Sequence, residues 1–185
     1  ITAGTLAITG STGLGIHFRD IVGAGTANWD LSARTDGGAG DYGGNSGITF
    51  SPAITCYWAT NTGNWMTPSK WKTTSGGATT ARIPLPQDTA IFDANSFTLA
   101  GQTVTSSGSG YIITPGNFDW TGVTNSPTWN MQYSHEFYGS AIVTAGVTIT
   151  SSLGMGYPLS LMSRGASTIQ SGGNTWPLAF ALTGG

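Results

Sequence analysis

Apolar and polar residues alternate along this chain in runs of only a few residues, and each run is bounded by glycine or serine. The phrases GTLAITGS from Gly4, GQTVTSSG from Gly101, GVTITSS from Gly146 and GASTIQSG from Gly165 share this form. Each is typical of a glycine turn, a short strand rich in β-branched residues and a small polar stop. The pattern therefore predicts an all-β chain built from many short strands.

The same alternation places eight strands in the second half of the chain. We expect them at residues 97–105, 111–114, 118–121, 136–144, 147–150, 159–163, 168–170 and 176–182.

The repeated phrases are unevenly spaced, with 45 residues from Gly101 to Gly146 and 19 residues from Gly146 to Gly165. Steps of this kind fit coils of about 20 residues, a size that β-solenoids use. One such coil buries too little apolar surface to fold alone, so its edges must pair with the coils above and below. We therefore expect a right-handed parallel β-solenoid, with a β-sandwich of irregular hairpins as the alternative.

Composition along the chain divides it into three segments. Residues 1–50 are expected to form the end of a preceding β-module together with a glycine-rich loop. Residues 51–96 form a tryptophan-rich opening or cap segment, and residues 97–185 form the solenoid coils. Because the chain opens on Ile1 and closes on LTGG after the apolar run WPLAFAL, we expect it to be a piece of a longer polypeptide.

The charge of the chain limits its partners. Only 8% of the residues are charged, the net charge is −2, and the six basic residues are scattered along the sequence. This pattern gives no electrostatic footprint for nucleic acid or for an acidic membrane surface. No run approaches the 18 apolar residues of a membrane span, so we expect neither nucleic acid nor membrane insertion.

The stretch ITGSTGLGIHF, residues 8–18, looks at first like a dinucleotide-binding loop. Its glycines Gly10, Gly13 and Gly15 are spaced one residue short of the reductase pattern T-G-x-x-x-G-x-G. Residues 19–44 carry no apolar stripe of period 3.6, so no helix follows whose amino end could hold a pyrophosphate. We interpret these glycines as turn formers and expect no cofactor.

Large aromatic residues gather in the middle of the chain. Trp58, Trp65 and Trp71 have two interpretations. They form either a flat platform for stacking sugar rings, which makes them the candidate ligand-binding residues, or a plug for the end of a solenoid or the hinge between modules. The plug is the favoured interpretation.

Two constellations near the N-terminus resemble functional motifs and are explained more simply. Residues 36–45, DGGAGDYGGN, resemble a calcium-binding glycine nonapeptide, but Asp41 falls one place early and the motif occurs once. His17, Asp36 and Ser46 follow the order of one serine-protease triad within a span too short to assemble it. We expect no metal site and no catalytic triad.

The remaining reactive side chains also favour structural roles. His135 and Glu136 are neighbours on a predicted strand, so they point to opposite faces. Asp93 and Asp119 both follow phenylalanine and form the one carboxylate pair considered for glycoside cleavage, but each is better explained as a turn cap. Cys56, the only cysteine, lies between apolar neighbours and is expected to be a buried, inert thiol.

Several longer phrases occur in a fixed order: YWATNTGNWMTPSKWKTTSGG, IPLPQDTAIFDANSFTLAGQTVT, FDWTGVTNSPTW and FYGSAIVTAGVTIT. Over roughly residues 48–152 this order resembles repetitive β-helical modules in large structural proteins of tailed bacteriophages and in related bacterial surface proteins. The resemblance implies a tryptophan-rich opening followed by structural turn residues, which here are Pro84, Pro86, Asp88, Asp93 and Asn95.

Low charge, abundant threonine, serine and glycine, short repeated strands and this resemblance lead to one functional expectation. The chain is expected to be a non-enzymatic segment of a phage tail fibre, spike or related appendage at the virion surface or outside the cell. Its expected partners are copies of itself in a homotrimer, neighbouring virion or surface proteins, and a host-surface glycan. The alternatives are a bacterial adhesin module and a glycan-binding or glycan-cleaving domain.

Overall fold

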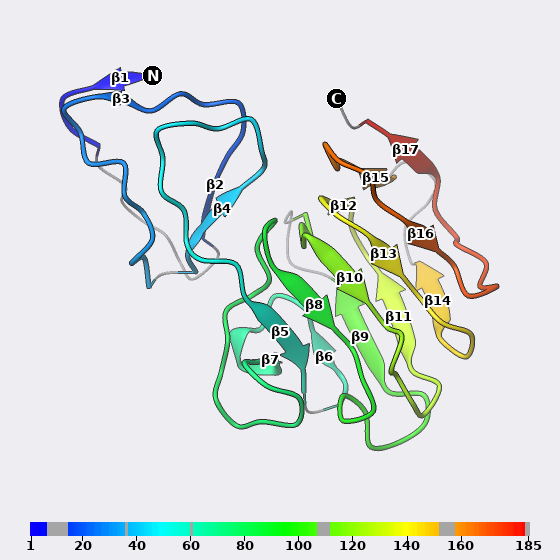
Figure 1. Ribbon diagram of the computed structural model, residues 1–185. Helices are drawn as coiled ribbons and strands as arrows, with labels where there is room; N and C mark the ends of the chain where they lie inside the picture. The colour runs from blue at the N-terminus through cyan, green and yellow to red at the C-terminus, as the bar shows by residue number, and fades with distance from the viewer. Residues whose placement is uncertain (7–14, 36, 60, 107–111, 152–157, 184–185) are drawn as a thin grey trace.

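The computed structural model describes residues 1–6, 15–35, 37–59, 61–106, 112–151 and 158–183. These residues form a parallel β-solenoid of about seven turns, and their one helical element is the short 3-10 helix η1, Pro68–Lys70. Strands that neighbour one another in space come from successive coils and run parallel (Figure 1). The prediction of a β-solenoid is therefore confirmed, and the β-sandwich is excluded.

The largest sheet takes one strand from each of five successive coils and has the order β16-β13-β10-β8-β5-β7. All its neighbours are parallel except β5 and β7, which are antiparallel. Its strands are β5 (Thr55–Trp58), β7 (Trp71–Lys72), β8 (Thr89–Ile91), β10 (Asn117–Asp119), β13 (Ala141–Ile142) and β16 (Ile169–Gln170).

Two further sheets complete the sides of the coils. The second has the order β14-β11-β9-β6 and the third the order β12-β15-β17, again with parallel neighbours. Their strands are β6 (Gly63–Asn64), β9 (Thr103–Ser106), β11 (Thr128–Met131), β14 (Thr148–Ser151), β12 (His135–Phe137), β15 (Leu159–Leu161) and β17 (Phe180–Leu182).

The coils are longer and less regular than the sequence suggests. Paired residues are 34 positions apart between β5 and β8, 28 between β8 and β10, 23 between β10 and β13 and 28 between β13 and β16. The phrases from Gly101 and Gly146 supply β9 and β14 of the second sheet, whereas the phrase from Gly165 supplies β16 of the first. The expected coil of about 20 residues is wrong here because similar phrases lie on different sides of the solenoid.

Close-packed corners set where strands end. A Cβ on Gly116 would lie 2.5 Å from the Pro86 carbonyl oxygen, and one on Gly139 would lie 2.9 Å from the Gly116 carbonyl oxygen. Gly139 therefore forms a corner inside the strand expected at 136–144, which is in fact two strands, β12 and β13. The strand expected at 97–105 begins later, as β9 at Thr103. The residues before it form a turn, because the Asn61 and Gln102 side chains accept the Thr98 N–H.

The core is a column of aromatic and aliphatic side chains between the sheets. Phe92 stacks on Trp120 at a centroid distance of 4.0 Å and an angle of 17°, and also contacts Trp58 at 5.7 Å. Phe118 lies 4.5 Å from Trp129. Trp58, Phe92 and Trp120 come from three successive coils. Each of these coils is therefore buried in part by its neighbours.

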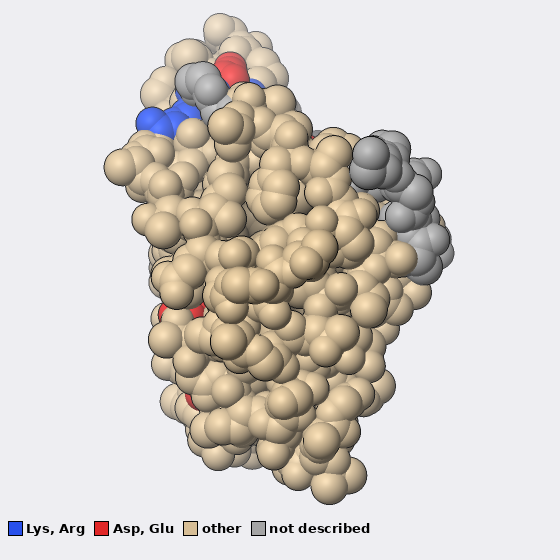
Figure 2. Space-filling view, turned by 90° about the vertical axis from the view of Figure 1, so that its right-hand side faces the viewer, with Lys and Arg blue, Asp and Glu red and all other residues tan. Residues whose placement is uncertain are grey.

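The two ends of the coil stack differ. At the β5 end, the antiparallel strand β7 closes the first sheet and carries the buried Trp71. At the other end, Phe180 and Leu182 of β17 are exposed. Their partners on β15 are less exposed: Leu159 is buried and Leu161 is partly buried. Figure 2 looks onto this second end and shows an almost uncharged surface, with charged atoms near its upper and left margins.

The N-terminal residues form their own short parallel pairs. β1 (Thr2–Ala3) pairs with β3 (Ala24–Gly25), and β2 (Ile16–Phe18) pairs with β4 (Ala39–Asp41). The side chain of Gln87 joins this part to the solenoid, since its Nε2 donates to the carbonyl oxygens of Ala39 and Ser51, both at 2.9 Å. The segment 51–96, expected as a cap, also supplies β5 and β6 of the first full coil.

Candidate functional site

The predicted glycan platform does not exist on the surface. Trp58, Trp65 and Trp71 have exposed fractions of 0%, 1% and 0%. Alternation along β5 turns Trp58 inward, and the indole N–H groups of Trp58 and Trp71 donate to the carbonyl oxygens of Asn61 and Trp65, each at 2.9 Å. The platform interpretation is wrong because the three rings face the core, where they pack against one another and against Phe92.

The predicted turn residues are placed as expected. Pro84 and Pro86 are buried, and Asp88 is fully buried within their turn. The Asp88 carboxylate accepts hydrogen bonds from the Ile54 and Leu85 N–H groups at 2.9 and 2.8 Å and pairs with Arg82 at 2.6 Å. Asp88 therefore joins two successive coils as well as shaping its own turn.

Asp93 and Asp119 each cap a turn. Asp93 Oδ1 accepts the Asn95 N–H at 2.9 Å, and the Asn95 side chain donates to Ser75. Asp119 Oδ1 accepts both the N–H and the hydroxyl of Thr121. Each carboxylate accepts the backbone N–H of the residue two positions later, which confirms the turn-cap interpretation.

The constellations near the N-terminus lie only partly within the described residues. Asp36, Gly10 and Gly13 lie outside the described residues. His17 contacts Tyr42 through its Nδ1 at 2.7 Å, while Ser46 pairs with Val22 in a parallel bridge. Gly15 has a φ of +77° and lies against the Gly38 carbonyl oxygen, so it is a turn former as expected.

His135 and Glu136 lie on opposite faces of β12, as their adjacency predicts. His135 is buried, its Nε2 lies 2.7 Å from the Ser106 hydroxyl, and burial lowers its pKa to about 3. Cys56 is fully buried, and burial raises the pKa of its thiol to about 12. Both groups are therefore uncharged core residues at neutral pH.

A cluster that the sequence did not reveal lies where the N-terminal part meets the solenoid. We call Arg19, Tyr42, Tyr138 and Arg164 the tyrosine–arginine cluster. The rings of Tyr42 and Tyr138 are stacked at a centroid distance of 4.6 Å and an angle of 4°. Tyr42 follows β4 and Tyr138 follows β12, so the pair joins the N-terminal strands to the later coils.

Arg19 and Glu136 fix the hydroxyl of Tyr138. The Arg19 guanidinium donates to that hydroxyl at 2.8 Å and lies 5.6 Å from the centre of the ring. The hydroxyl in turn donates to Glu136 Oε2 at 2.9 Å. Burial and this bond to Glu136 raise the pKa of Tyr138, so the phenol stays protonated and acts as a donor.

Arg164 reaches the same place from the loop after β15. Its Nη2 pairs with Asp20 at 2.5 Å, and the side chain is 41% exposed. An ion pair this exposed contributes little to stability. Its position is more informative, because Arg164 lines the same pocket as Tyr42 and Tyr138.

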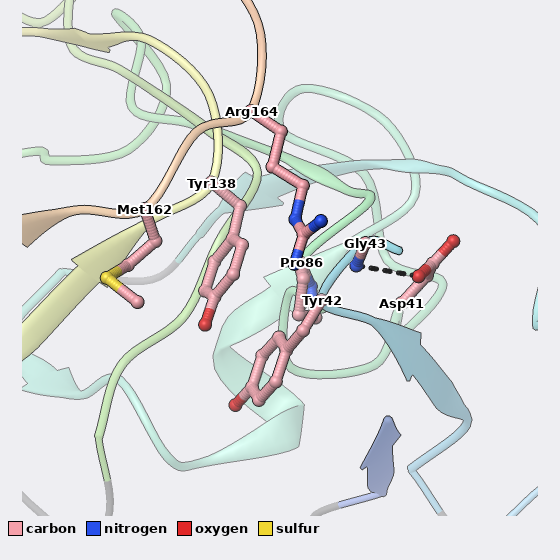
Figure 3. Close-up of a pocket in the computed structure, with 7 residues that line it drawn as sticks. All are labelled: Asp41, Tyr42, Gly43, Pro86, Tyr138, Met162 and Arg164. Carbon is pink, nitrogen blue, oxygen red and sulfur yellow. Dashed lines mark hydrogen bonds between the residues drawn. The ribbon is translucent and has the colours of Figure 1, made fainter. Parts of the chain in front are cut away.

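Three members of the cluster, Tyr42, Tyr138 and Arg164, line an open pocket of about 120 Å³ (Figure 3). The lining residues are Asp41, Tyr42, Gly43, Pro86, Tyr138, Met162 and Arg164. A second pocket of about 160 Å³ shares Met162 and Arg164 with the first and is also lined by Arg19, Asp20 and Thr183. The two pockets therefore lie next to each other with Met162 and Arg164 between them, and we refer to them together as the depression.

No local sequence signal identifies this depression. Tyr42 stands in a glycine-rich loop and Tyr138 follows a strand 96 positions later, and only the fold brings them together. Within the described parts of the chain, no group of three or more His, Cys, Asp or Glu side chains is arranged to hold a metal ion. Those parts also contain no helix long and apolar enough to cross a membrane.

Comparison with protein-family models, with curated proteins and with solved structures gave no match to this chain.

Proposed function

We propose that this chain is a structural, non-enzymatic module of an extracellular appendage, specifically a tail fibre or spike at a virion surface. The observation that carries the proposal is the parallel stacking of successive coils, in which inner coils are buried by their neighbours. Phe180 and Leu182 on β17 are 45% and 80% exposed, whereas Leu159, which pairs with Phe180, is fully buried and Leu161, which pairs with Leu182, is partly buried. Solenoids extend by stacking one coil on the last, so this end suits a further β-structure.

The composition and the turns support the same role. Polar side chains form a ladder along one corner: Asn117 Nδ2 donates to Thr89, the Ser140 N–H donates to Asn117 Oδ1, and the Thr168 N–H donates to the Ser140 hydroxyl. Such turns bond to one another, coil to coil, without charged residues. The likeness to tailed-phage modules over residues 48–152 is the reason to place the module on a virion.

Localisation tests this proposal. Antibodies against the exposed segment 73–80 should label projecting fibres in electron micrographs of the particles or cells that carry the protein. Labelling confined to bacterial cell walls would indicate the adhesin alternative. Labelling confined to a soluble fraction would contradict an appendage role altogether.

We further propose that the module associates as a homotrimer, by likeness to fibrous appendages. Sedimentation equilibrium of the purified chain measures this directly. A mass three times that of the 19.0 kDa chain is expected. A single monomeric species at high protein concentration would contradict it.

A further inference from the structure

We propose that the pocket beside Tyr138 binds a neutral hexopyranoside. This inference concerns residues other than the buried tryptophans and does not depend on the appendage role.

The lining of the pocket has the two elements that sugar rings require. Tyr42, Tyr138 and Met162 supply the smaller, apolar part of the lining, against which C–H groups of a pyranose can pack, and the stacking of the two rings holds that part in place. Arg164 and Asp41 supply planar polar groups for its hydroxyls. Ligand sites commonly combine apolar walls with a few fixed polar groups in this way.

The polar groups are oriented before any ligand arrives. Asp41 Oδ1 accepts the Gly43 N–H at 2.8 Å and the Asn45 Nδ2–H at 2.6 Å, while Oδ2 carries no hydrogen bond from the described residues. Asp20 holds one nitrogen of Arg164, and the guanidinium stays 41% exposed. A sugar hydroxyl can therefore bond to both side chains without displacing these bonds.

The charges around the pocket favour a neutral sugar over an acidic one. Two guanidinium groups, Arg19 and Arg164, face three carboxylates, Asp20, Asp41 and Glu136. A ligand carboxylate would add a further negative charge to a group that already has one more carboxylate than guanidinium groups. Uncharged hydroxyl groups meet no such repulsion.

The size of the depression suits one ring with a substituent. Both pockets are open, with volumes of about 120 and 160 Å³, so the glycosidic substituent of a ring bound in one of them can extend into solvent. A shallow site of this size corresponds to a dissociation constant on the order of 1 mM.

Saturation-transfer NMR of the full chain with methyl glycosides of glucose, galactose, mannose and N-acetylglucosamine tests the proposal. At least one glycoside should receive saturation from the protein. Methyl glucuronide should bind no more tightly than the methyl glucoside. Absence of transfer to all four neutral glycosides, or a preference for the glucuronide, would overturn the proposal.

Variants locate the binding in this pocket. Arg164→Gln should weaken binding about tenfold, since it removes a charged donor from an exposed position. Met162→Trp should abolish binding, because the larger indole fills the pocket that Met162 lines. Lys72→Gln removes a cation from the opposite end of the first sheet and should leave binding unchanged. Unaltered binding in Met162→Trp with an intact fold would place the sugar elsewhere and refute the assignment.

Discussion

Asp88 shows how much of the fold depends on one buried side chain. Its carboxylate accepts N–H groups from two coils and pairs with Arg82, whose side chain is itself only 18% exposed. Asp88→Asn would remove the negative charge that pairs with Arg82. It would also place the asparagine NH₂ group against a donor that now bonds to the carboxylate. We expect a loss of about 3–5 kcal/mol in the free energy of unfolding, measured by urea denaturation.

Asp119→Asn is the matched control for this change. Asp119 also shapes a turn, but an asparagine keeps the Oδ1 acceptor for Thr121. Its cost should stay within about 0.5 kcal/mol. Equal costs for the two variants would show that Asp88 acts as an ordinary turn cap.

The two histidines make stability depend on pH. Burial lowers the pKa of His17 to about 4 and that of His135 to about 3. The unfolded chain, with ordinary histidines, takes up protons first as the pH falls below about 6.5. Stability is therefore complete above that pH and declines below it, by at most about 1.4 kcal/mol per pH unit for each histidine.

Urea denaturation between pH 7.5 and 5 measures this slope above the range in which carboxylates titrate. His135→Leu should reduce it by about half, and leucine suits the position because His135 pairs with Leu159 in the inward ladder. A slope that is flat in the unaltered protein would rule out the buried neutral histidines.

At the residue scale, sequence reasoning succeeded where the chemistry is local. Asp93 and Asp119 bond to backbone groups within three residues, so composition alone indicates their roles. Tyr42 and Tyr138 could not be found in this way, since nothing near either residue specifies a partner so far along the chain. The glycan platform failed because a tryptophan pattern does not distinguish the inside of a strand from its outside.

At the scale of elements, the first coil and β7 form a cap built around tryptophan. Trp71 packs against Trp58 and Trp65 at centroid distances of 5.2 and 4.5 Å. Trp71→Ala should therefore cost about 3–5 kcal/mol in unfolding free energy. Tyr57→Ala, on the outward face of β5, should cost about 1 kcal/mol, and similar values for both would contradict a tryptophan-centred cap.

The turn after β16 offers a test of coil stacking with two adjacent glycines. Gly172 and Gly173 both have positive φ, at +60° and +81°. A Cβ on Gly172 would lie 2.6 Å from the Ala145 nitrogen of the preceding coil, while one on Gly173 meets nothing within 4 Å. Gly172→Ala should cost about 3 kcal/mol and Gly173→Ala about 1 kcal/mol by thermal or urea unfolding.

If the two alanine variants lost equal stability, backbone conformation alone would govern this turn. The close approach of the two coils would then contribute nothing measurable to stability.

Element positions were predictable to the extent that alternation and glycine turns are local signals. Strands near 147–150, 159–163 and 168–170 correspond to β14, β15 and β16. Coil length was not predictable, because corners such as Gly139 depend on contacts between coils rather than on neighbouring residues. The same dependence explains why identical-looking phrases lie on different sheets.

At the scale of the whole molecule, the asymmetry of the two ends is the main feature. One end is closed by β7 and its buried indole, and the other leaves Phe180 and Leu182 exposed on an almost uncharged surface. Uncovered apolar ladders at a parallel edge invite pairing with further strands. We therefore expect further β-structure to pair with the β17 edge in the native assembly.

Electron cryo-microscopy of the native assembly, at a resolution that separates strands, tests this expectation most directly. We expect density for parallel strands to continue beyond β17 along the solenoid axis, within a fibre or spike built from several copies. Discrete globular particles in which the β17 edge faces solvent would contradict it.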